Sequence, residues 1–308
     1  MSSPVVVLAG GTGGAKLARG MLDVVGADEL IVIANTGDDI EIYGAYVAPD
    51  PDLITFWLAD LIDERGWGLR ADTFHTMQGL GDLGADVWFN LGDRDLAIGI
   101  ERARMLAEGV RPTEAQRRLA AALGVEARVL PMSDRPVRTR VIAHNRTWGL
   151  QEFLIQGRGQ GPVEAVDFSG AANASATPEA LEAIGAARAI LIGPSNPVIS
   201  IGPILAVPGV RDALRAAHAP VVAVSPLVQG TVVKGPTEPF LQWLGQPLNS
   251  QGIVAAYSGI IDGLVADERT ELLPVLETNV LMDTPEARAR VADEALGFAL
   301  ALGASASG

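Results

Sequence analysis

An apolar strand that runs directly into a glycine-rich turn constrains this chain more than any other feature of its sequence. Val5–Ala9 is followed by Gly10-Gly11-Thr12-Gly13-Gly14-Ala15 and then by Lys16. Glycine can adopt positive φ and lets backbone N–H groups approach an anion closely at the start of the following helix. The pattern therefore predicts a strand, a phosphate-binding loop and a helix, with Lys16 as a cation at the mouth of the site.

The loop differs from two familiar phosphate-binding fingerprints. A Walker A loop has Gly-Lys followed by Ser or Thr, whereas Ala15 precedes Lys16 and Leu17 follows it. The dinucleotide fingerprint has a third Gly or Ala where Lys16 stands. The sequence thus argues against a P-loop ATPase and against a Rossmann dehydrogenase. The alternative to a phosphate-binding loop is a glycine-rich turn that only packs the helix on the strand.

Composition excludes several kinds of site and partner. The chain of 308 residues has no cysteine, which removes disulfides, thiolate catalysis and Cys-ligated metals, and it has only three histidines. A formal net charge of −14 argues against a nucleic-acid partner. There is no long apolar run and no signal peptide, so we expect a cytoplasmic protein without membrane contact. A small anionic ligand accompanied by Mg²⁺ suits this composition.

Short apolar runs alternate with helical periodicity, which is typical of an α/β fold. The runs expected to form buried parallel strands are Val5–Ala9, Leu30–Ala34, Ala189–Ile192 and Val221–Val224. The helices are expected at 16–25, 52–63, 95–108, 113–123, 178–187, 210–217 and 285–302. We predict a doubly wound, mostly parallel, Rossmann-like sheet.

The middle of the chain has a different pattern, with helices followed by Gly-rich turns. Short antiparallel strands are expected at Val129–Leu130, Val137–Ala143, Gln151–Ile155 and Val163–Asp167. We predict a single domain over 1–308, with a core sheet from about 1–49 and 168–308 and an inserted cap of helices and short strands over about 50–167. The cap is expected to lie over the ligand crevice.

Two acidic segments are expected beside the phosphate loop. Asn35-Thr36-Gly37-Asp38-Asp39 follows the second strand, and Pro49-Asp50-Pro51-Asp52 stands at the head of a helix. Carboxylates suit Mg²⁺, which keeps waters and substrate phosphate oxygens in its shell. We therefore predict metal ligands among Asp38, Asp39, Asp50 and Asp52. Helix capping by Asp50 and an Asx turn at Asp38 are the alternative.

Two further segments carry side chains suited to phosphate or nucleotide recognition. Leu91-Gly92-Asp93-Arg94-Asp95 offers an arginine to a phosphate or carboxylate, or forms only a surface ion pair and a helix cap. Gly193-Pro194-Ser195-Asn196-Pro197 follows a buried strand and presents a hydroxyl and an amide between two prolines, or is only a stiff turn.

With these segments in view, the chain resembles the 2-phospho-L-lactate transferase family of coenzyme F420 biosynthesis, which includes the actinobacterial phosphoenolpyruvate transferases. Other motifs add to the resemblance, which spans nearly the whole chain: Leu130-Pro131-Met132-Ser133-Asp134, Gln151-Glu152-Phe153 and Ser200-Ile201-Gly202-Pro203-Ile204. The resemblance implies transfer of a phospholactyl or phosphoenolpyruvyl group from its guanosine-diphosphate-activated form. The acceptor is the ribityl hydroxyl of 7,8-didemethyl-8-hydroxy-5-deazariboflavin, GMP leaves, and Mg²⁺ is required.

The same resemblance implies roles for individual residues. Gly11, Thr12, Gly13 and Lys16 line the diphosphate, Ser195 and Asn196 face the guanosine, and Asp52, Asn90 and Arg94 lie near the deazaflavin, with Asn35 among the ligand-binding residues. Catalysis is expected from Asp50, Asp52 and Lys16, because phosphoryl transfer depends on positioning and charge neutralisation. Asp52 is the candidate for accepting the proton of the attacking hydroxyl.

A nucleotide-binding regulatory protein of the same fold, without transferase activity, is the alternative. Such a protein could keep the glycine loop and lose Asp50, Asp52 and the Asp93-Arg94-Asp95 set, all of which are present here. We also expect a homodimer. The sequence leaves open whether phospholactate, phosphoenolpyruvate or phosphoglycerate is carried, because the shape of the pocket decides among them.

Overall fold

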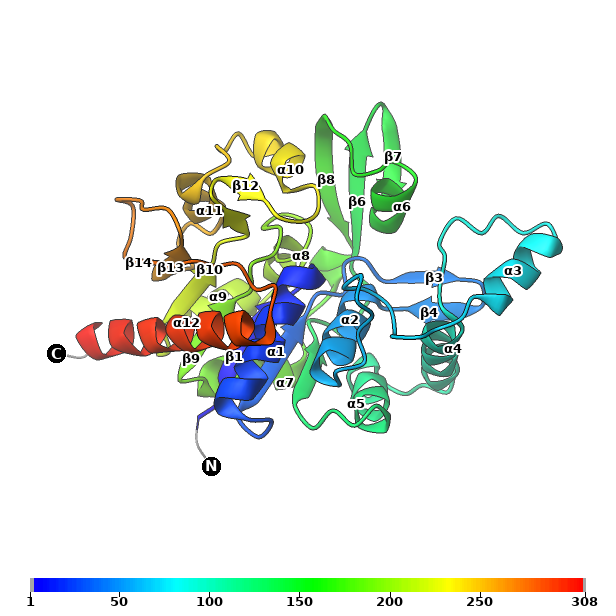
Figure 1. Cartoon of the computed structure of the whole chain (residues 1–308), viewed down its shortest axis with the longest axis horizontal. Coiled ribbons are helices and arrows are strands. Elements are labelled where there is room, and N and C mark those ends of the chain that lie inside the picture. Colours follow the sequence, from blue (N-terminus) through cyan, green and yellow to red (C-terminus); the bar gives the residue numbers. More distant parts are fainter. Residues whose placement is uncertain (1–2, 307–308) are drawn as a thin grey trace.

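A seven-stranded parallel sheet forms the centre of the computed structural model, which describes residues 3–306 (Figure 1). The strand order is β14–β13–β10–β9–β1–β2–β5, and each neighbouring pair is parallel. The strands are β1 (Val5–Ala9), β2 (Leu30–Ala34), β5 (Arg128–Pro131), β9 (Ala189–Ile192), β10 (Val221–Val224), β13 (Gly263–Ala266) and β14 (Val275–Glu277). The predicted doubly wound α/β fold is confirmed.

Alternating side chains of β1 pack into two separate cores, one on each face of the sheet. Val5 and Val7 lie in the core that α1 (Gly11–Val25) and α12 (Pro285–Ala306) cover, together with α2 (Pro49–Leu58) and α5 (Pro112–Ala122). Val6 and Leu8 lie in the other core, beneath α7 (Pro178–Ala186), α8 (Gly202–Ala206), α9 (Val210–Ala216) and α11 (Ser250–Ala256). Burial on both faces explains why these strands are continuous apolar runs.

The position of β1 creates a crevice at the carboxyl edge of the sheet. From β1 the chain moves to β2 on one side, and it later returns to β9 on the other side of β1. In open parallel sheets, ligands bind outside the carboxyl ends of the strands at such a switch point. The glycine-rich turn after β1 and the Ser195 loop after β9 flank this crevice.

Several predicted elements have different ends or a different type. The helix expected at 16–25 begins at Gly11, and the helix expected at 52–63 runs from Pro49 to Leu58. The expected strand Gln151–Ile155 is wrong, because this segment forms α6 (Leu150–Ile155). Glu152 Oε2 accepts a hydrogen bond from the N–H of Gly149 at 3.0 Å, which satisfies a backbone donor at the start of that helix.

The segment Val129–Leu130 was expected among the antiparallel strands of the insertion, and this is also wrong. It belongs to β5, which pairs in parallel with β2 at the edge of the central sheet. Both side chains are buried. The run was too short for its pattern to distinguish the two kinds of strand.

Smaller elements lie above and to one side of the central sheet (Figure 1). A three-stranded antiparallel sheet, in the order β7–β6–β8, stands beside α6 and α10 (Thr237–Trp243). Its strands are β6 (Arg138–Ala143), β7 (Arg146–Gly149) and β8 (Val163–Ser169). A hairpin of β3 (Ile40–Ile42) and β4 (Ala45–Val47) packs with α3 (His75–Asp82) and α4 (Asp93–Ala107).

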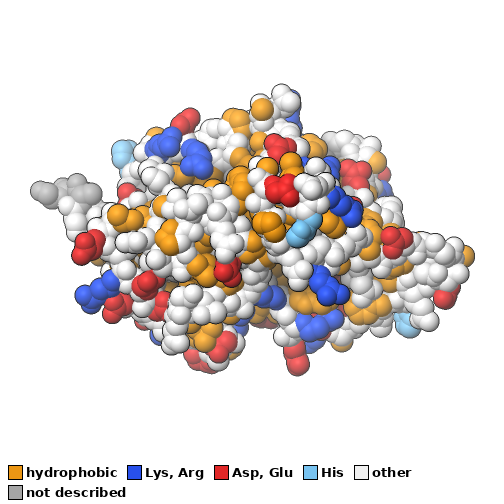
Figure 2. All heavy atoms as spheres, turned by 90° about the horizontal axis from the view of Figure 1, so that it is seen from above, with side chains coloured by type: hydrophobic (Ala, Val, Ile, Leu, Met, Phe, Trp, Pro, Cys, Tyr) orange, Lys and Arg blue, Asp and Glu red, His pale blue; other side chains and the backbone are white. Residues whose placement is uncertain are grey.

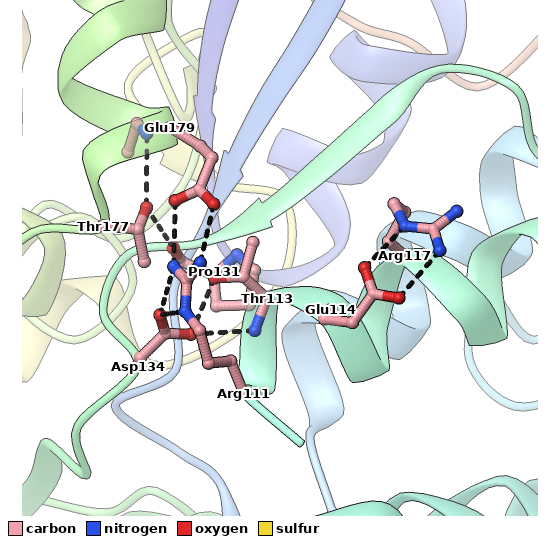
Figure 3. Close-up of polar contacts among 9 residues, drawn as sticks. Arg111, Thr113, Glu114, Arg117, Pro131, Asp134, Thr177 and Glu179 are labelled. Carbon is pink, nitrogen blue, oxygen red and sulfur yellow. Dashed lines mark hydrogen bonds and ion pairs between the residues drawn. The ribbon is translucent and has the colours of Figure 1, made fainter.

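Arg111 ties together three segments that are far apart in the sequence (Figure 3). Its guanidinium donates to Asp134, in the loop after β5, and to both carboxylate oxygens of Glu179 in α7. Asp134 also accepts a hydrogen bond from the backbone N–H of Thr113 at 2.8 Å. This network fixes the start of α5 against the edge of the sheet.

The surface seen from above has acidic, basic and hydrophobic side chains mixed together (Figure 2). On this face, basic side chains therefore lie among the acidic ones, although the chain as a whole has a net negative charge. Among the described residues, no helix is both long and apolar enough to cross a membrane.

Candidate active site

The first turn of α1 presents backbone donors to the crevice. Gly11 has φ of +63°, and its N–H donates to Asp50 Oδ1 at 2.6 Å. The N–H of Gly14 donates to Ser195 Oγ at 3.0 Å. Thr12 and Gly13 lie between them, and their N–H groups have no acceptor within the helix because they belong to its first turn. These donors, together with the helix dipole, form a site for an anion.

Glycine is required at two positions of this turn because other backbone segments approach very closely. A Cβ atom on Gly13 would lie 1.8 Å from the carbonyl oxygen of Pro194. A Cβ atom on Gly10 would lie 2.7 Å from the carbonyl oxygen of Ser200 and 2.8 Å from Asp50 Oδ2. Because Gly10 and Gly13 have no side chain, the loops after β1 and β9 can lie in direct contact.

The first of two adjoining cavities, which we call the loop cavity, has a volume of about 370 Å³. Its walls include Gly11, Thr12, Gly13, Lys16, Ser195, Asn196, Ser200, Lys234 and Met282. Six residues that the sequence predicted as ligand contacts therefore line one cavity. This cavity lies at the switch point of the sheet, where ligands bind in folds of this class.

Ser195 and Asn196 also hold the crevice in shape. Besides accepting the hydrogen bond from Gly14, the Ser195 hydroxyl donates to the carbonyl oxygen of Gly10. Asn196 Oδ1 accepts from the N–H groups of Val198 at 2.9 Å and Ile199 at 3.2 Å. Both side chains therefore stabilise the loop whose surface lines the cavity.

Basic groups gather near the first turn of α1. Burial lowers the pKa of Lys16, and the charges of Arg288 and Lys234 lower it further. The Lys16 ammonium lies 6.0 Å from the centre of the Trp57 ring, and the Arg288 guanidinium lies 5.0 Å from the same centre. A bound anion would relieve this repulsion among like charges.

The second cavity, which we call the aromatic cavity, has a volume of about 620 Å³. It shares Gly11, Thr12, Leu154 and Lys234 with the loop cavity. Its aromatic walls are Phe56, Trp67, Phe74, Trp88 and Phe89. Trp67 is 45% exposed, and the Arg65 guanidinium lies 4.4 Å from the centre of its ring. Such a cavity suits a planar ring system.

Asp38 and Asp50 both line the aromatic cavity, and Asp50 accepts the hydrogen bond from Gly11 of the glycine turn. Burial raises the pKa of Asp38 well above its usual range, and the charge of Asp50 adds to this. Burial also raises the pKa of Asp50 to about 6, although the Asn35 amide and the Gly11 N–H oppose the increase. Asn35 Nδ2 donates to Asp50 at 2.8 Å, and Gln151 Nε2 donates to Asp38 at 2.9 Å.

Asn35 is therefore a positioning residue for Asp50, since it is buried and does not line either cavity. Asp39 is separated from its neighbour Asp38. It lines a different cavity, with Arg102 and Arg138, and its Oδ2 accepts a hydrogen bond from the Tyr46 hydroxyl at 2.9 Å. Burial raises the pKa of Asp39 to about 7.

Asp52 lines the aromatic cavity but is also paired. Arg102 Nη1 donates to its Oδ2 at 2.9 Å, and Nη2 donates to its Oδ1. Gln116 Oε1 accepts a further hydrogen bond from Arg102 at 3.2 Å. The carboxylate is thus held in one orientation at the cavity wall.

The Asp93-Arg94-Asp95 segment is divided among different roles. Asp93 accepts hydrogen bonds from Thr73 and from backbone N–H groups at the start of α3, and these lower its pKa. Arg94 is exposed and donates to the carbonyl oxygen of Arg70 at 3.3 Å, without lining either cavity. Asp95 does line the aromatic cavity, as Asn90 does, and burial raises the pKa of Asp95 to about 7.

Within residues 3–306, no group of three or more His, Asp or Glu side chains is arranged to hold a metal ion on its own. Mg²⁺ commonly uses one or two protein carboxylates, with waters and substrate phosphates completing its shell. Asp38 and Asp50 fit this requirement, because Asp38 Oδ1 is buried without a hydrogen-bond partner in the described part of the chain. Among the described residues, Asp39 Oδ1 also has no hydrogen-bond partner, but Asp39 lines a different cavity, and both carboxylate oxygens of Asp52 accept hydrogen bonds from Arg102.

Sequence reasoning missed several residues of the site. Lys234 lies in the loop after the hairpin of β11 (Leu227–Val228) and β12 (Thr231–Val232), and it lines both cavities. Gln151 was recognised as part of a motif, but its contact with Asp38 depends on α6 being a helix.

The fold and the site define an α/β protein in which the N-terminus of a helix, suited to a phosphorylated ligand, lies beside carboxylates and an aromatic cavity. The family model described as 2-phospho-L-lactate transferase CofD matches residues 5–292. The chain belongs to this family, so it is a transferase of the CofD type.

Relatives from archaea and bacteria support this membership. The 2-phospho-L-lactate transferase of Methanosarcina mazei is 38% identical over 266 residues, which cover 86% of this chain and 87% of that protein. The phosphoenolpyruvate transferase of Kitasatospora aureofaciens is 38% identical over 317 residues and covers 96% of this chain and 97% of its own length. The recognition made from the motifs is therefore confirmed.

A solved structure shows the same fold. A member of the UPF0052 family from Bacillus halodurans superposes with a TM-score of 0.55 at 20% identity, covering 88% of this chain and 83% of its own. At this identity the likeness concerns the arrangement of helices and strands and not the chemistry.

Proposed function

We propose that the protein transfers a phospholactyl or phosphoenolpyruvyl group in coenzyme F420 biosynthesis. The donor is the guanosine-diphosphate-activated acid, the acceptor is the ribityl hydroxyl of the deazaflavin, and GMP is released. One observation carries the proposal: an anion-binding cavity and an aromatic cavity meet at Gly11, Thr12 and Lys234. A transfer between two substrates needs this adjacency, because the reacting atoms have to come within about 3–3.5 Å.

The loop cavity is proposed to hold the nucleotide part of the donor. The N–H groups of Thr12 and Gly13 would donate to phosphate oxygens, and Lys16 would neutralise part of their charge. Ser195 and Asn196 would lie beside the guanosine, which they border through the loop that they stabilise.

The aromatic cavity is proposed to hold the deazaflavin. Its ring would stack on side chains such as Trp67 and Trp88, and its ribityl chain would extend toward the glycine turn. Asn90 borders the same cavity, whereas Arg94 would reach the ligand only by leaving its contact with Arg70. The acceptor hydroxyl would then face the donor phosphorus.

Asp38 and Asp50 would hold Mg²⁺ against the donor. When bound, the ion would neutralise charge that develops on the phosphate oxygens. Asp50 also holds the N–H of Gly11, so the proposed metal site and the first turn of α1 are positioned together. Asp52 is the proposed acceptor of the hydroxyl proton, since a carboxylate has about four lone-pair sites and Arg102 uses two of them.

The proposal is tested by incubating the purified protein with the deazaflavin, Mg²⁺ and each activated acid separately. Mass spectrometry is expected to detect one phosphodiester product, together with GMP. The preferred acid is identified by the largest kcat/KM. Absence of product with the phospholactyl, phosphoenolpyruvyl and phosphoglyceryl donors would contradict the transferase proposal and favour the nucleotide-binding regulatory protein.

A further inference from the structure

We propose that Lys234 binds the phosphoryl group that is transferred, whereas Lys16 binds the phosphate that leaves with GMP. This inference rests on the proposed function and assigns a different phosphate of the donor to each of the two lysines. Among the residues that the structure describes, Lys234 is the one charged side chain lining both cavities. Lys16 lines the loop cavity alone.

The ammonium group of Lys234 lies where two loops meet above α1. It donates to the carbonyl oxygen of Arg65 at 3.5 Å. A Cβ atom built on Gly66 would lie 3.5 Å from Lys234 Nζ and 3.8 Å from the Thr12 methyl carbon. The ammonium is thus placed close to the first turn of α1, at the boundary between the cavities.

The hydrogen-bonding capacity of this ammonium is largely unused. A lysine has three N–H donors, and the single contact with Arg65 is at the long limit for a hydrogen bond. Within the described chain, neither Lys16 nor Lys234 forms an ion pair with a carboxylate. Two donors therefore remain for a substrate.

The charges around Lys234 favour a dianionic group between it and Lys16. Each lysine has a pKa below its ordinary value because it is partly desolvated, and the charge of Lys234 lowers the pKa of Lys16. A diphosphate between them would have one phosphate beside each lysine, and its two negative charges would offset the repulsion between the ammonium groups.

The chemistry of the transfer distinguishes the two phosphates of the donor. The acceptor hydroxyl oxygen forms a bond to the phosphorus that carries the acid, and the bond from this phosphorus to the bridging oxygen breaks. The bridging oxygen leaves with GMP, and the hydroxyl proton passes to a carboxylate or to solvent. Only the transferred phosphorus has to contact both substrates, so the cation that borders both cavities is the one suited to bind it.

Nucleotide binding tests the assignment without requiring turnover. GDP carries a second phosphate where the donor carries its transferred group, and GMP lacks it. Isothermal titration in the presence of Mg²⁺ is expected to show that Lys234→Met weakens GDP binding about tenfold and leaves GMP binding within about twofold. Lys16→Met, the matched control, is expected to weaken both ligands. Lys234→Arg should recover most of the GDP affinity, whereas Lys234→Gln should not.

Kinetics provide a second, separate measurement. Lys234→Met is expected to lower kcat about 100-fold, since it removes a charge that faces the transferred group. Wild-type GDP affinity in Lys234→Met, or equal losses for GMP and GDP, would overturn the assignment. A wild-type protein that turns over none of the donors would instead refute the proposed function, and the GDP and GMP titrations would still decide the role of Lys234.

Discussion

Arg102 holds Asp52 in a buried ion pair beside the aromatic cavity. The two side chains are 4% and 7% exposed, and the arginine approaches both carboxylate oxygens. Arg102 comes from α4, whereas Asp52 lies in the first turn of α2. The pair therefore joins α4 to α2, which packs on the central sheet, at the point where the proposed proton acceptor stands.

Removing Arg102 is expected to destabilise the protein strongly. Arg102→Met leaves Asp52 buried without its partner, which costs about 3–5 kcal/mol of the free energy of unfolding. Urea denaturation followed by circular dichroism measures this. The double variant Arg102→Met/Asp52→Asn should recover part of the loss, because it removes the unpaired charge. Equal stability of Arg102→Met and wild type would show that the pair is not buried in solution.

Asp52→Asn is expected to lower kcat by about 10²- to 10⁴-fold, the usual contribution of a general base. Single-turnover assays with saturating substrates measure the chemical step. The amide keeps an oxygen for Arg102, so the fold is expected to survive. Full turnover of Asp52→Asn with an unchanged requirement for Mg²⁺ would exclude Asp52 as the proton acceptor.

Asp38→Asn is expected to abolish stabilisation by Mg²⁺. In the wild-type protein, millimolar Mg²⁺ together with GDP should raise the melting temperature, because a ligand that binds only the folded state stabilises it. The variant lacks a carboxylate of the proposed pair, and its melting temperature should no longer respond to the metal. Asp39→Asn is the matched control from the adjacent position, and it should respond as the wild type does. Loss of the response in both variants would contradict the separation of Asp38 from Asp39.

Asp95→Asn is expected to stabilise the protein at pH 8 and to have less effect at pH 4. The pKa of Asp95 is raised to about 7 by burial and by the charges of Asp52 and Asp72. An acid whose pKa is higher in the folded state than in the unfolded state binds its proton more tightly when folded. Its contribution to stability is therefore lost as the pH rises from about 4 to about 7. Urea titrations across this range should show the gain of the variant growing with pH, and a constant difference would contradict the raised pKa.

Gly13→Ala is expected to abolish nucleotide binding and to lower stability. The added Cβ would lie 1.8 Å from the Pro194 carbonyl, so the loops after β1 and β9 would have to separate. Gly297→Ala in α12 is the control, because nothing lies within 4 Å of the added atom. The control should raise stability by about 0.5–1 kcal/mol, as expected for alanine in a helix. Titration with GDP and thermal denaturation measure both effects, and normal GDP binding by Gly13→Ala would contradict the close contact.

The strands of the central sheet that were predicted are uninterrupted apolar runs, whereas β13, which is equally short and buried but begins with Gly263, was missed. The runs in β1, β2, β9 and β10 were recognised because neither side of the sheet is exposed to water. Val129–Leu130 was assigned to the wrong sheet, since two apolar residues contain no information about which strand they pair with. Gln151–Ile155 was assigned the wrong type of structure because five residues cannot separate the two periodicities.

The site was predicted as a set of segments, and the fold determined which of their side chains face the cavities. Asp38 and Asp39 are adjacent in sequence, yet they line different cavities. Arg94 was expected to face a phosphate or carboxylate, or to form a surface ion pair, but it donates to the carbonyl oxygen of Arg70, while Asp93 accepts hydrogen bonds from the first N–H groups of α3. Neither outcome follows from residue type or spacing, because each depends on the elements packed around the residue.

The sequence by itself determined that the first strand passes through a glycine-rich turn into a helix, because an apolar run followed by several glycines has few other structures open to it. It also determined the family, through motifs distributed along the chain. Only the tertiary structure decided that Lys234 stands between the two cavities, that Asn35 holds Asp50 and that Arg102 holds Asp52. The physical reason is that backbone conformation depends mainly on neighbouring residues, whereas the charge and hydrogen bonding of a buried side chain depend on residues that only folding brings near.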